Sequence, residues 1–293
     1  MDSPSDPNSR TPPIDRNRDL LKLAQVESYK VLGDEKLNAY IWHPDPEKTG
    51  PLPRPVAAFF FSSGWDHGQV SQFAPHCVYF ASRGMVCVAF DYRVSTKHGT
   101  GPIEAIEDAG DALRWLRINA AELNINLNHI IGIGGSGGAY AVAANALLTP
   151  PLKRKEVLPD IHPIPNALVL FNPVLDTSKD GFGFDRFPDP ASAKKHNLLR
   201  AVRRKLPPTL ILHGTADRVI PVTASRSYTR KNAWRRNLCR LVEFEGAGHG
   251  FFNFNVSFER YEATLLAIDD FLVSLNLIQP DPDSLLGDTS YTM

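Results

Sequence analysis

Short apolar segments alternate with longer amphipathic ones along the middle of the chain. The short segments are rich in β-branched and aromatic residues and are bounded by Pro, Gly and Asn, which is typical of buried strands. Between them, apolar side chains recur every three or four residues, as at Ile106, Ala109, Leu113 and Leu116, which indicates amphipathic helices. This alternation predicts an α/β fold whose central, mostly parallel sheet is flanked by helices on both faces. The expected core strands are 55–61, 85–90, 129–133, 167–171, 209–213 and 239–244, preceded by an antiparallel pair at 26–31 and 37–42.

The two ends and two long connections differ from this pattern. Residues 1–19 and 279–293 contain few apolar side chains, which predicts a flexible arm and a flexible tail around a single domain at 20–278. Loop insertions near 149–166 and 173–208 exceed the usual length, and long loops after parallel strands often form substrate sites. The second insertion carries Phe182, Phe184 and Phe187. These rings either cover an acyl or aromatic group, or pack on one another at the surface.

Composition narrows the range of functions. The 293 residues are 43% hydrophobic, which is enough for a large core, and Lys+Arg and Asp+Glu both total 32. With no net charge, the chain lacks the field expected of a protein that binds nucleic acid or an anionic membrane. The odd number and wide spacing of the cysteines predict reduced, packed thiols and no metal site. The polar first residues and the lack of a long apolar segment predict a cytoplasmic protein without a signal peptide or membrane span. The cysteines are Cys77, Cys87 and Cys239.

One glycine-rich turn carries the chemistry. Ser136 stands in Gly134-Gly135-Ser136-Gly137-Gly138, directly after an apolar strand and before a helical segment. A nucleophilic serine in a Gly-x-Ser-x-Gly turn adopts strained backbone angles, and the residues two before and two after it must be small. The alternative is a phosphate-binding loop, but the acidic residue expected about 20 positions later is missing and no Lys-Ser/Thr follows. We therefore interpret Ser136 as a nucleophile.

A serine nucleophile needs a base and an orienting acid, and in α/β hydrolases these follow in the order Ser, Asp/Glu, His. His249 lies between glycines after the last strand, and Asp217 follows the strand before it. Asp176 is a rival acid, because some hydrolases take the carboxylate from an earlier strand. His213 ends a strand upstream of Asp217, so we expect a hydrogen-bonded structural role for it.

The reaction also needs backbone N–H groups aimed at the oxyanion. Gly137 is expected to supply one, and Ser63 and Gly64, after the 55–61 strand, to supply the other; a serine hydroxyl is an alternative donor. Contacts with the substrate are expected from the residues just beyond this loop and from one aromatic residue of the second insertion. They are Trp65, Asp66, His67 and Phe182.

Four motifs follow one another in chain order. They are Asp91-Tyr92-Arg93, the turn around Ser136, Asp217-Arg218-Val219-Ile220-Pro221 and His249-Gly250-Phe251. In this order they resemble carboxylesterases of the α/β-hydrolase superfamily, near the hormone-sensitive-lipase-like and acetyl-esterase or acetylxylan-esterase-like branch, over about residues 50–275. Two positions depart from the family pattern. Phe61-Ser62-Ser63-Gly64 replaces the oxyanion loop His-Gly-Gly-Gly, although serine resists the positive φ that glycine accepts, and Gly137 replaces the usual alanine.

The resemblance implies hydrolysis of a small-molecule ester through an acyl-enzyme on Ser136, with no cofactor or metal. We expect short, acetyl-like acyl groups, including acetylated sugars, with aromatic acyl esters as a further possibility. Two alternatives stay open: a serine peptidase of the same fold, and a non-catalytic receptor that keeps the pocket. The sequence does not determine the oligomeric state or the natural ester.

Overall fold

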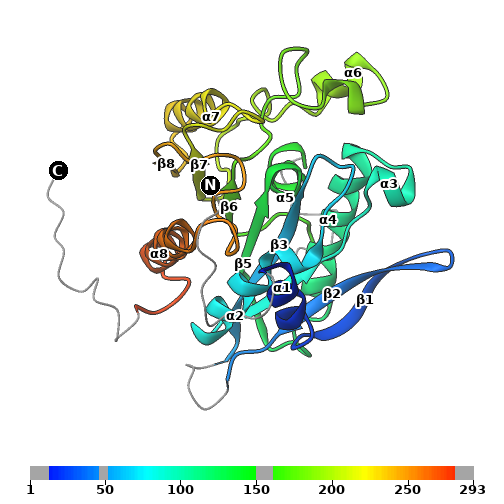
Figure 1. Ribbon diagram of the computed structural model, residues 1–293, viewed down its shortest axis with the longest axis vertical. Helices are drawn as coiled ribbons and strands as arrows, with labels where there is room; N and C mark the ends of the chain where they lie inside the picture. Colours follow the sequence, from blue (N-terminus) through cyan, green and yellow to red (C-terminus); the bar gives the residue numbers. More distant parts are fainter. Residues whose placement is uncertain (1–12, 46–51, 150–160, 281–293) are drawn as a thin grey trace, which may run out of the picture.

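The computed structural model describes residues 13–45, 52–149 and 161–280. Its eight strands, in chain order, are β1 (Gln25–Leu32), β2 (Glu35–Trp42), β3 (Arg54–Ser63), β4 (Val86–Phe90), β5 (Ile125–Gly135), β6 (Ala167–Phe171), β7 (Thr209–Gly214) and β8 (Cys239–Phe244) (Figure 1). They form one sheet in the order β1-β2-β4-β3-β5-β6-β7-β8. β2 is antiparallel to both β1 and β4, and the other neighbours are parallel. The predicted α/β fold with a mostly parallel sheet is confirmed.

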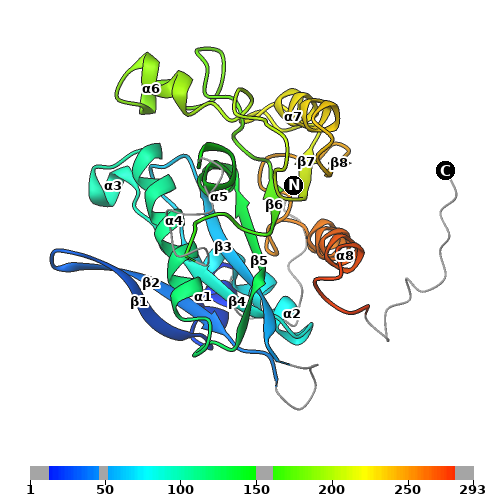
Figure 2. The same cartoon turned by 180° about the vertical axis from the view of Figure 1, so that it is seen from behind.

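Helices cover both faces of this sheet (Figure 2). They are α1 (Pro13–Leu21), α2 (Ala74–Ser82), α3 (Ser95–His98), α4 (Pro102–Ile118), α5 (Ser136–Leu148), α6 (Pro190–Lys195), α7 (Thr223–Trp234) and α8 (Phe258–Ser274), with 3-10 turns η1 (Val70–Phe73) and η2 (Phe184–Arg186). Alternate side chains of a strand point to opposite faces. Accordingly, Val56, Ala58 and Phe60 of β3 pack in the cluster that includes α4 and α5, whereas Ala57 and Phe59 pack in the cluster that includes α2 and α8.

The described part of the N-terminal segment differs from the expected flexible arm. Residues 13–19 belong to α1, where Asn17 is buried. Leu20 and Leu21, at the end of this helix, pack against the cluster that includes α2 and α8, and the carbonyl of Leu20 accepts a hydrogen bond from the Trp42 indole (3.3 Å). Two apolar side chains at a helix end therefore anchor a segment whose composition is otherwise polar. Residues 1–12 and 281–293 lie outside the described residues.

The connection from β6 to β7 contains η2 and α6 and lies at the same end of the molecule as α7 (Figures 1 and 2). Phe187 is buried, and its ring contacts Trp65 (6.3 Å between centroids) and Tyr140 (6.4 Å). Phe182 and Phe184 pack against the same core cluster. These rings thus pack onto the domain rather than only on one another. Of the other insertion, residues 150–160 lie outside the described residues.

All three cysteines are free, and Cys77 and Cys87 are buried, in agreement with the expectation of packed thiols. Across the parts of the chain that the structure describes, no helix has the length and apolar character needed to span a membrane.

His76 of α2 is a fully buried imidazole, and neither ring nitrogen has a hydrogen-bond partner among the described residues. Its ring packs against Phe73 (5.1 Å between centroids), Phe171 (5.8 Å) and Tyr261 (4.8 Å). Burial lowers the pKa of His76 to about 3, because the charged form is cut off from water. The folded protein therefore holds this ring neutral, whereas the unfolded chain protonates it near its ordinary pKa.

We expect His76→Phe to flatten the acid side of the stability profile. The folded pKa lies below the unfolded one, so the stability that His76 allows is fully present above about pH 6.5 and is lost as the pH falls toward 3. The loss is about 1.4 kcal/mol per pH unit, which urea unfolding at pH 7.5, 5.5 and 4.5 measures. His43→Phe, at an exposed histidine, is the control. Equal pH slopes for His76→Phe and the unmodified protein would contradict the assignment.

Candidate active site

Ser136 lies at the junction of β5 and α5, with φ of +50°. It is 3% exposed. A Cβ at Gly134 would lie 2.6 Å from the backbone nitrogen of Ala139, and one at Gly138 would overlap the Phe61 carbonyl oxygen. The strained angle and the need for small residues on both sides are therefore present, as expected for a strand-to-helix turn that presents a nucleophile.

The structure brings Ser136, His249 and Asp217 together from loops after three different strands. His249 Nε2 lies 3.1 Å from Ser136 Oγ, and His249 Nδ1 lies 2.7 Å from Asp217 Oδ2. Since a carboxylate only accepts, Nδ1 carries the proton and Nε2 is left to accept the proton of the serine hydroxyl. This arrangement can deprotonate Ser136 and later return the proton to a leaving group.

Asp217 is 7% exposed, and its carboxylate is fixed at both oxygens. Oδ1 accepts hydrogen bonds from the backbone N–H groups of Val219 (2.8 Å) and Ile220 (3.0 Å). Burial alone would raise the pKa of Asp217, but the facing imidazoles of His213 and His249 and the Ile220 N–H outweigh it and hold this pKa well below its usual range. Asp217 is therefore ionised at neutral pH.

The two other candidates have different partners. His213 is fully buried. Its Nδ1 lies 2.9 Å from Ser225 Oγ, and its Nε2 lies 2.9 Å from the Ile220 carbonyl oxygen. Asp176, the rival acid, accepts hydrogen bonds at Oδ1 from the Ser178 N–H (3.0 Å) and the Asn197 amide (2.6 Å). Asp176 thus fastens a turn within the β6 to β7 connection.

Asn172 is a site residue that the sequence reasoning missed. It follows β6, is fully buried and has φ of +40°. Its amide donates to the His249 carbonyl (2.5 Å) and its Oδ1 accepts from the Gly214 N–H (3.0 Å), so it joins the loops that carry His249 and Asp217. The signal was an Asn-Pro pair directly after a buried strand, where an asparagine tolerates the left-handed conformation.

The loop after β3 runs alongside the nucleophile, because Ser63 forms a β-bridge with Ser136. The positive φ of this loop falls on Trp65 (+66°), whereas Ser62 and Ser63 avoid that region. Ser63 Oγ accepts from the Trp65 N–H (3.0 Å) and lies 2.6 Å from the Tyr92 hydroxyl, which itself lies 2.7 Å from the Phe61 carbonyl oxygen. With Tyr92 donating to Phe61, Ser63 donates to Tyr92. The Ser63 hydroxyl hydrogen is thus used within the loop and is not available to an oxyanion.

Gly137 has a steric reason to be glycine. A Cβ there would overlap the Ser63 carbonyl oxygen and would lie 2.9 Å from Trp65 Nε1, which donates to the Gly137 carbonyl (3.3 Å). The alanine that the family pattern carries at this position does not fit against this loop.

We therefore expect Gly137→Ala to lower kcat/KM by about 100-fold, since the methyl group must push the Ser63 carbonyl by roughly 1 Å. That carbonyl belongs to the same peptide unit as the Gly64 N–H, so the expected oxyanion donor moves with it. Steady-state kinetics on p-nitrophenyl acetate measures the loss, with a thermal unfolding curve to show that the variant is folded. A change below threefold would show that the loop adapts without cost.

The four expected substrate contacts lie in different environments. Trp65 is fully buried and packs on Tyr140 (5.1 Å between centroids), so its side chain belongs to the core next to the site. His67, with a side chain 82% exposed, lies 2.9 Å from Asp66. Phe182 is half-buried, and a Cβ at Gly64 would lie 3.3 Å from its ring. Of the four, Phe182 is the one that lines the cavity described below.

Arg186 of η2 is a second residue that the sequence reasoning missed. Its guanidinium donates to the Gly64 carbonyl (2.6 Å) and to the Asp66 carboxylate (3.3 Å). Although burial raises the pKa of Asp66, the His67 backbone N–H and the Arg186 charge lower it overall. The long β6 to β7 connection is thereby tied to the loop after β3.

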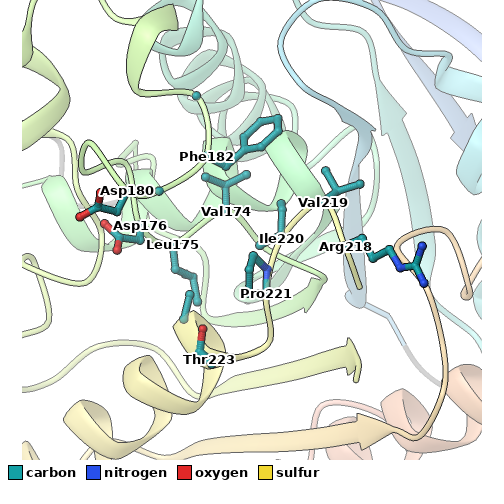
Figure 3. A pocket seen from close by; sticks show the side chains of 13 residues that line it. Val174, Leu175, Asp176, Asp180, Phe182, Arg218, Val219, Ile220, Pro221 and Thr223 are labelled. Carbon is teal, nitrogen blue, oxygen red and sulfur yellow. The ribbon is translucent and has the colours of Figure 1, made fainter. Parts of the chain in front are cut away.

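A cavity of about 420 Å³ is lined by residues that follow β6 and β7, among them Val174 and Ile220 (Figure 3). These two residues touch Ser136 and Asp217: the Val174 N–H donates to the Ser136 carbonyl (3.4 Å), and the Ile220 N–H donates to Asp217. The cavity has apolar side chains such as Phe182 and Val174 and charged ones such as Arg218, a mixture that can take a small substrate group. Within the described residues, no group of three or more His, Cys, Asp and Glu side chains is arranged to hold a metal ion.

Comparisons with known proteins find several esterases to which this chain is similar. The BD-FAE family model matches residues 41–156. Esterase LipC of Mycobacterium tuberculosis is 28% identical over 219 residues, which are 68% of this chain and 53% of the relative. The chain spans about half the length of the curated relatives it matches.

The solved structures match over nearly their whole length. Thermogutta terrifontis esterase 2 with bound propionate is 37% identical, with a TM-score of 0.79, over 89% of this chain and 97% of that one. The same esterase phosphorylated by paraoxon is also 37% identical, with a TM-score of 0.77 and the same coverage.

Proposed function

Since this chain belongs to the α/β-hydrolase family of carboxylesterases, we propose that it hydrolyses carboxylic esters through an acyl-enzyme on Ser136. The observation that carries the proposal is the unbroken series of hydrogen bonds from Asp217 through His249 to Ser136. A receptor that has lost its chemistry has no need for this series. A nucleophile, a base and an orienting acid in hydrogen-bond contact are the requirements of acyl transfer.

In the first half of the reaction, Ser136 Oγ attacks the acyl carbon while His249 Nε2 takes the hydroxyl proton. The N–H groups of Ser63, Gly64 and Gly137 are the donors proposed for the oxyanion. As the tetrahedral intermediate collapses, the bond to the alcohol oxygen breaks and His249 gives its proton to that oxygen. Asp217 stabilises the imidazolium throughout.

In the second half, a water molecule attacks the acyl carbon and His249 takes one of its protons. The bond from the carbonyl carbon to Ser136 Oγ then breaks, the serine recovers its proton from His249, and the carboxylic acid leaves. The same groups act in both halves, so no further residue is required.

We propose short acyl groups as the substrate class, including acetyl groups on sugars or small alcohols. The propionate-bound relative supports a short acyl group, because propionate is the acid that a propionyl ester would release. Val174 and Phe182 supply apolar contacts in the cavity for the group next to the carbonyl, and aromatic acyl esters are the second choice on account of Phe182. The proposed catalytic unit is one domain, because residues from three strands of a single sheet complete the site.

The test measures activity and labelling together. The full chain is assayed for hydrolysis of p-nitrophenyl acetate, butyrate and octanoate. The protein is then treated with paraoxon, and its peptides are analysed by mass spectrometry. We expect activity to fall with chain length, and paraoxon to abolish it while placing one diethylphosphoryl group on Ser136. Absence of turnover on every ester, or a label on a different residue, would refute the proposal.

A further inference from the structure

Gln72 of η1 holds the loop after β3 at the position where the family pattern has its first glycine. Its Oε1 accepts a hydrogen bond from the Ser62 N–H (2.5 Å), and its Nε2 donates to Ser62 Oγ (3.0 Å). Where the family pattern has a glycine, this chain has Ser62, and the Gln72 side chain binds both the backbone N–H and the hydroxyl of that serine. Ser63 and Gly64, the proposed oxyanion donors, follow one and two peptide units later.

The same Gln72 amide also makes a hydrogen bond toward the loop that carries His249. Its second N–H donates to Asn253 Oδ1 (2.8 Å), and Asn253 Nδ2 donates to the Gly250 carbonyl (2.9 Å). Gly250 follows His249 directly. Two side-chain amides thus form one bridge from Ser62 to the residue next to His249. The two amides, of Gln72 and Asn253, are 181 positions apart in the sequence.

The orientation of each amide in this bridge is fixed by its partners. The Ser62 N–H can only donate, so it selects the oxygen of Gln72 and directs both amide hydrogens toward Ser62 Oγ and Asn253. Asn253 must then accept through its oxygen, which turns its own nitrogen toward the Gly250 carbonyl. Turning over either amide would set donor against donor, so the bridge has one stable arrangement.

Ser62 also touches the turn that carries the nucleophile. A Cβ at Gly135 would overlap Ser62 Oγ, so this hydroxyl lies directly against the backbone before Ser136. Through Ser62, the bridge reaches all three parts of the site: the oxyanion loop, the nucleophile turn and the histidine loop.

We propose that Gln72 and Asn253 are positioning residues that hold the oxyanion donors in register with His249, an inference that rests on the proposed ester hydrolysis. Oxyanion donors act only when they lie 2.7–3.1 Å from the place where the charge develops, and an error of about 1 Å costs about 100-fold in rate. Glycine loops meet this demand through backbone geometry. This chain meets it through two amide side chains.

The test compares Gln72→Ala, Gln72→Met, Asn253→Ala and the double variant Gln72→Ala/Asn253→Ala on p-nitrophenyl acetate. We expect each single change to lower kcat by about 10- to 100-fold with KM changed less than threefold, because the loss falls on the transition state. The kcat of the double variant is expected to lie within about threefold of the lower of the two single-variant kcat values, since both changes break the same bridge. The pH at half-maximal activity is expected to stay the same, because the contact between His249 and Asp217 is intact.

Gln69→Ala and Asn255→Ala are matched controls, because both side chains are exposed and close in sequence to the bridge residues. If these controls lose as much kcat, or if the kcat losses follow a fall in the urea midpoint, the positioning role is refuted. Equal kcat in all variants and the unmodified protein would refute it too, while ester hydrolysis itself would stand. If the unmodified protein hydrolyses no ester faster than Ser136→Ala does, the proposed function fails instead.

Discussion

Replacing Ser136 by alanine is expected to lower kcat on p-nitrophenyl acetate by about 10⁶-fold. The methyl group leaves no atom that can form the acyl-enzyme, and His249 then has only water to activate. The residual rate should still exceed that of free solution by about 10³-fold or more, because the oxyanion donors and the cavity are unchanged. Ser136 is 3% exposed and stands on a turn with φ of +50°, so alanine fits the space but keeps the strain.

The comparison uses kcat from progress curves at high enzyme concentration. Ser95→Ala is the matched control, since Ser95 is likewise the first residue of a helix but is exposed and lies outside the site. It should hydrolyse the ester at the rate of the unmodified protein. A Ser136→Ala variant that keeps more than about one-hundredth of the activity would exclude a serine acyl-enzyme.

Replacing Asp217 by asparagine is expected to lower kcat by about 10⁴-fold. The asparagine oxygen can still accept from Val219 and Ile220, so the loop keeps its shape. Its nitrogen then faces His249 Nδ1 and stabilises the tautomer whose Nε2 carries the proton, which cannot accept the proton of Ser136. The imidazolium formed during attack also loses its facing negative charge.

The pH profile separates the roles of acid and base. Because the pKa of Asp217 lies well below its usual range, Asp217 stays ionised in mildly acidic solution, so protonation of this carboxylate should cause no loss of activity there. Asp176→Asn is the comparison, since Asp176 is the rival acid but accepts its hydrogen bonds from Ser178 and Asn197, within the β6 to β7 connection. Its effect on kcat should be at least about 100-fold smaller than that of Asp217→Asn. The reverse order would move the acid to Asp176.

Local patterns predict the elements that are set by local physics. The β6 and β8 strands have the expected bounds. β6 is a buried apolar run between Asn166 and Asn172, as expected of a strand covered on both faces, whereas the edge strand β8 exposes Arg240 and Glu243. β5 begins four residues before the expected 129, because polar residues such as Asn126 and Asn128 interrupt the apolar run. α1 escaped detection for a similar reason, since its composition resembles that of an unstructured arm.

The site residues also divide into those that the sequence indicates and those that only the folded structure reveals. Ser136, Asp217 and His249 could be proposed as a triad from the sequence, because the chemistry fixes both their residue types and their order along the chain, and the structure places them in hydrogen-bond contact. Asn172, Arg186 and the pair Gln72 and Asn253 could not, because their roles lie in hydrogen bonds between loops that only the folded sheet brings together. No periodicity marks such residues, and glutamine and asparagine occur on many surfaces.

The contact between Ser62 and Gly135 restricts the order in which this sequence can change. A Cβ at 135 overlaps the Ser62 hydroxyl and lies 3.0 Å from the Phe252 ring, so it requires that the hydroxyl be removed first and that the ring give way slightly. Changing Ser62 first leaves Gln72 without its hydroxyl partner. The two positions are thus epistatic. A directed-evolution library that varies one site at a time will discard both intermediates, whereas paired randomisation of 62 and 135 gives access to the combinations between them.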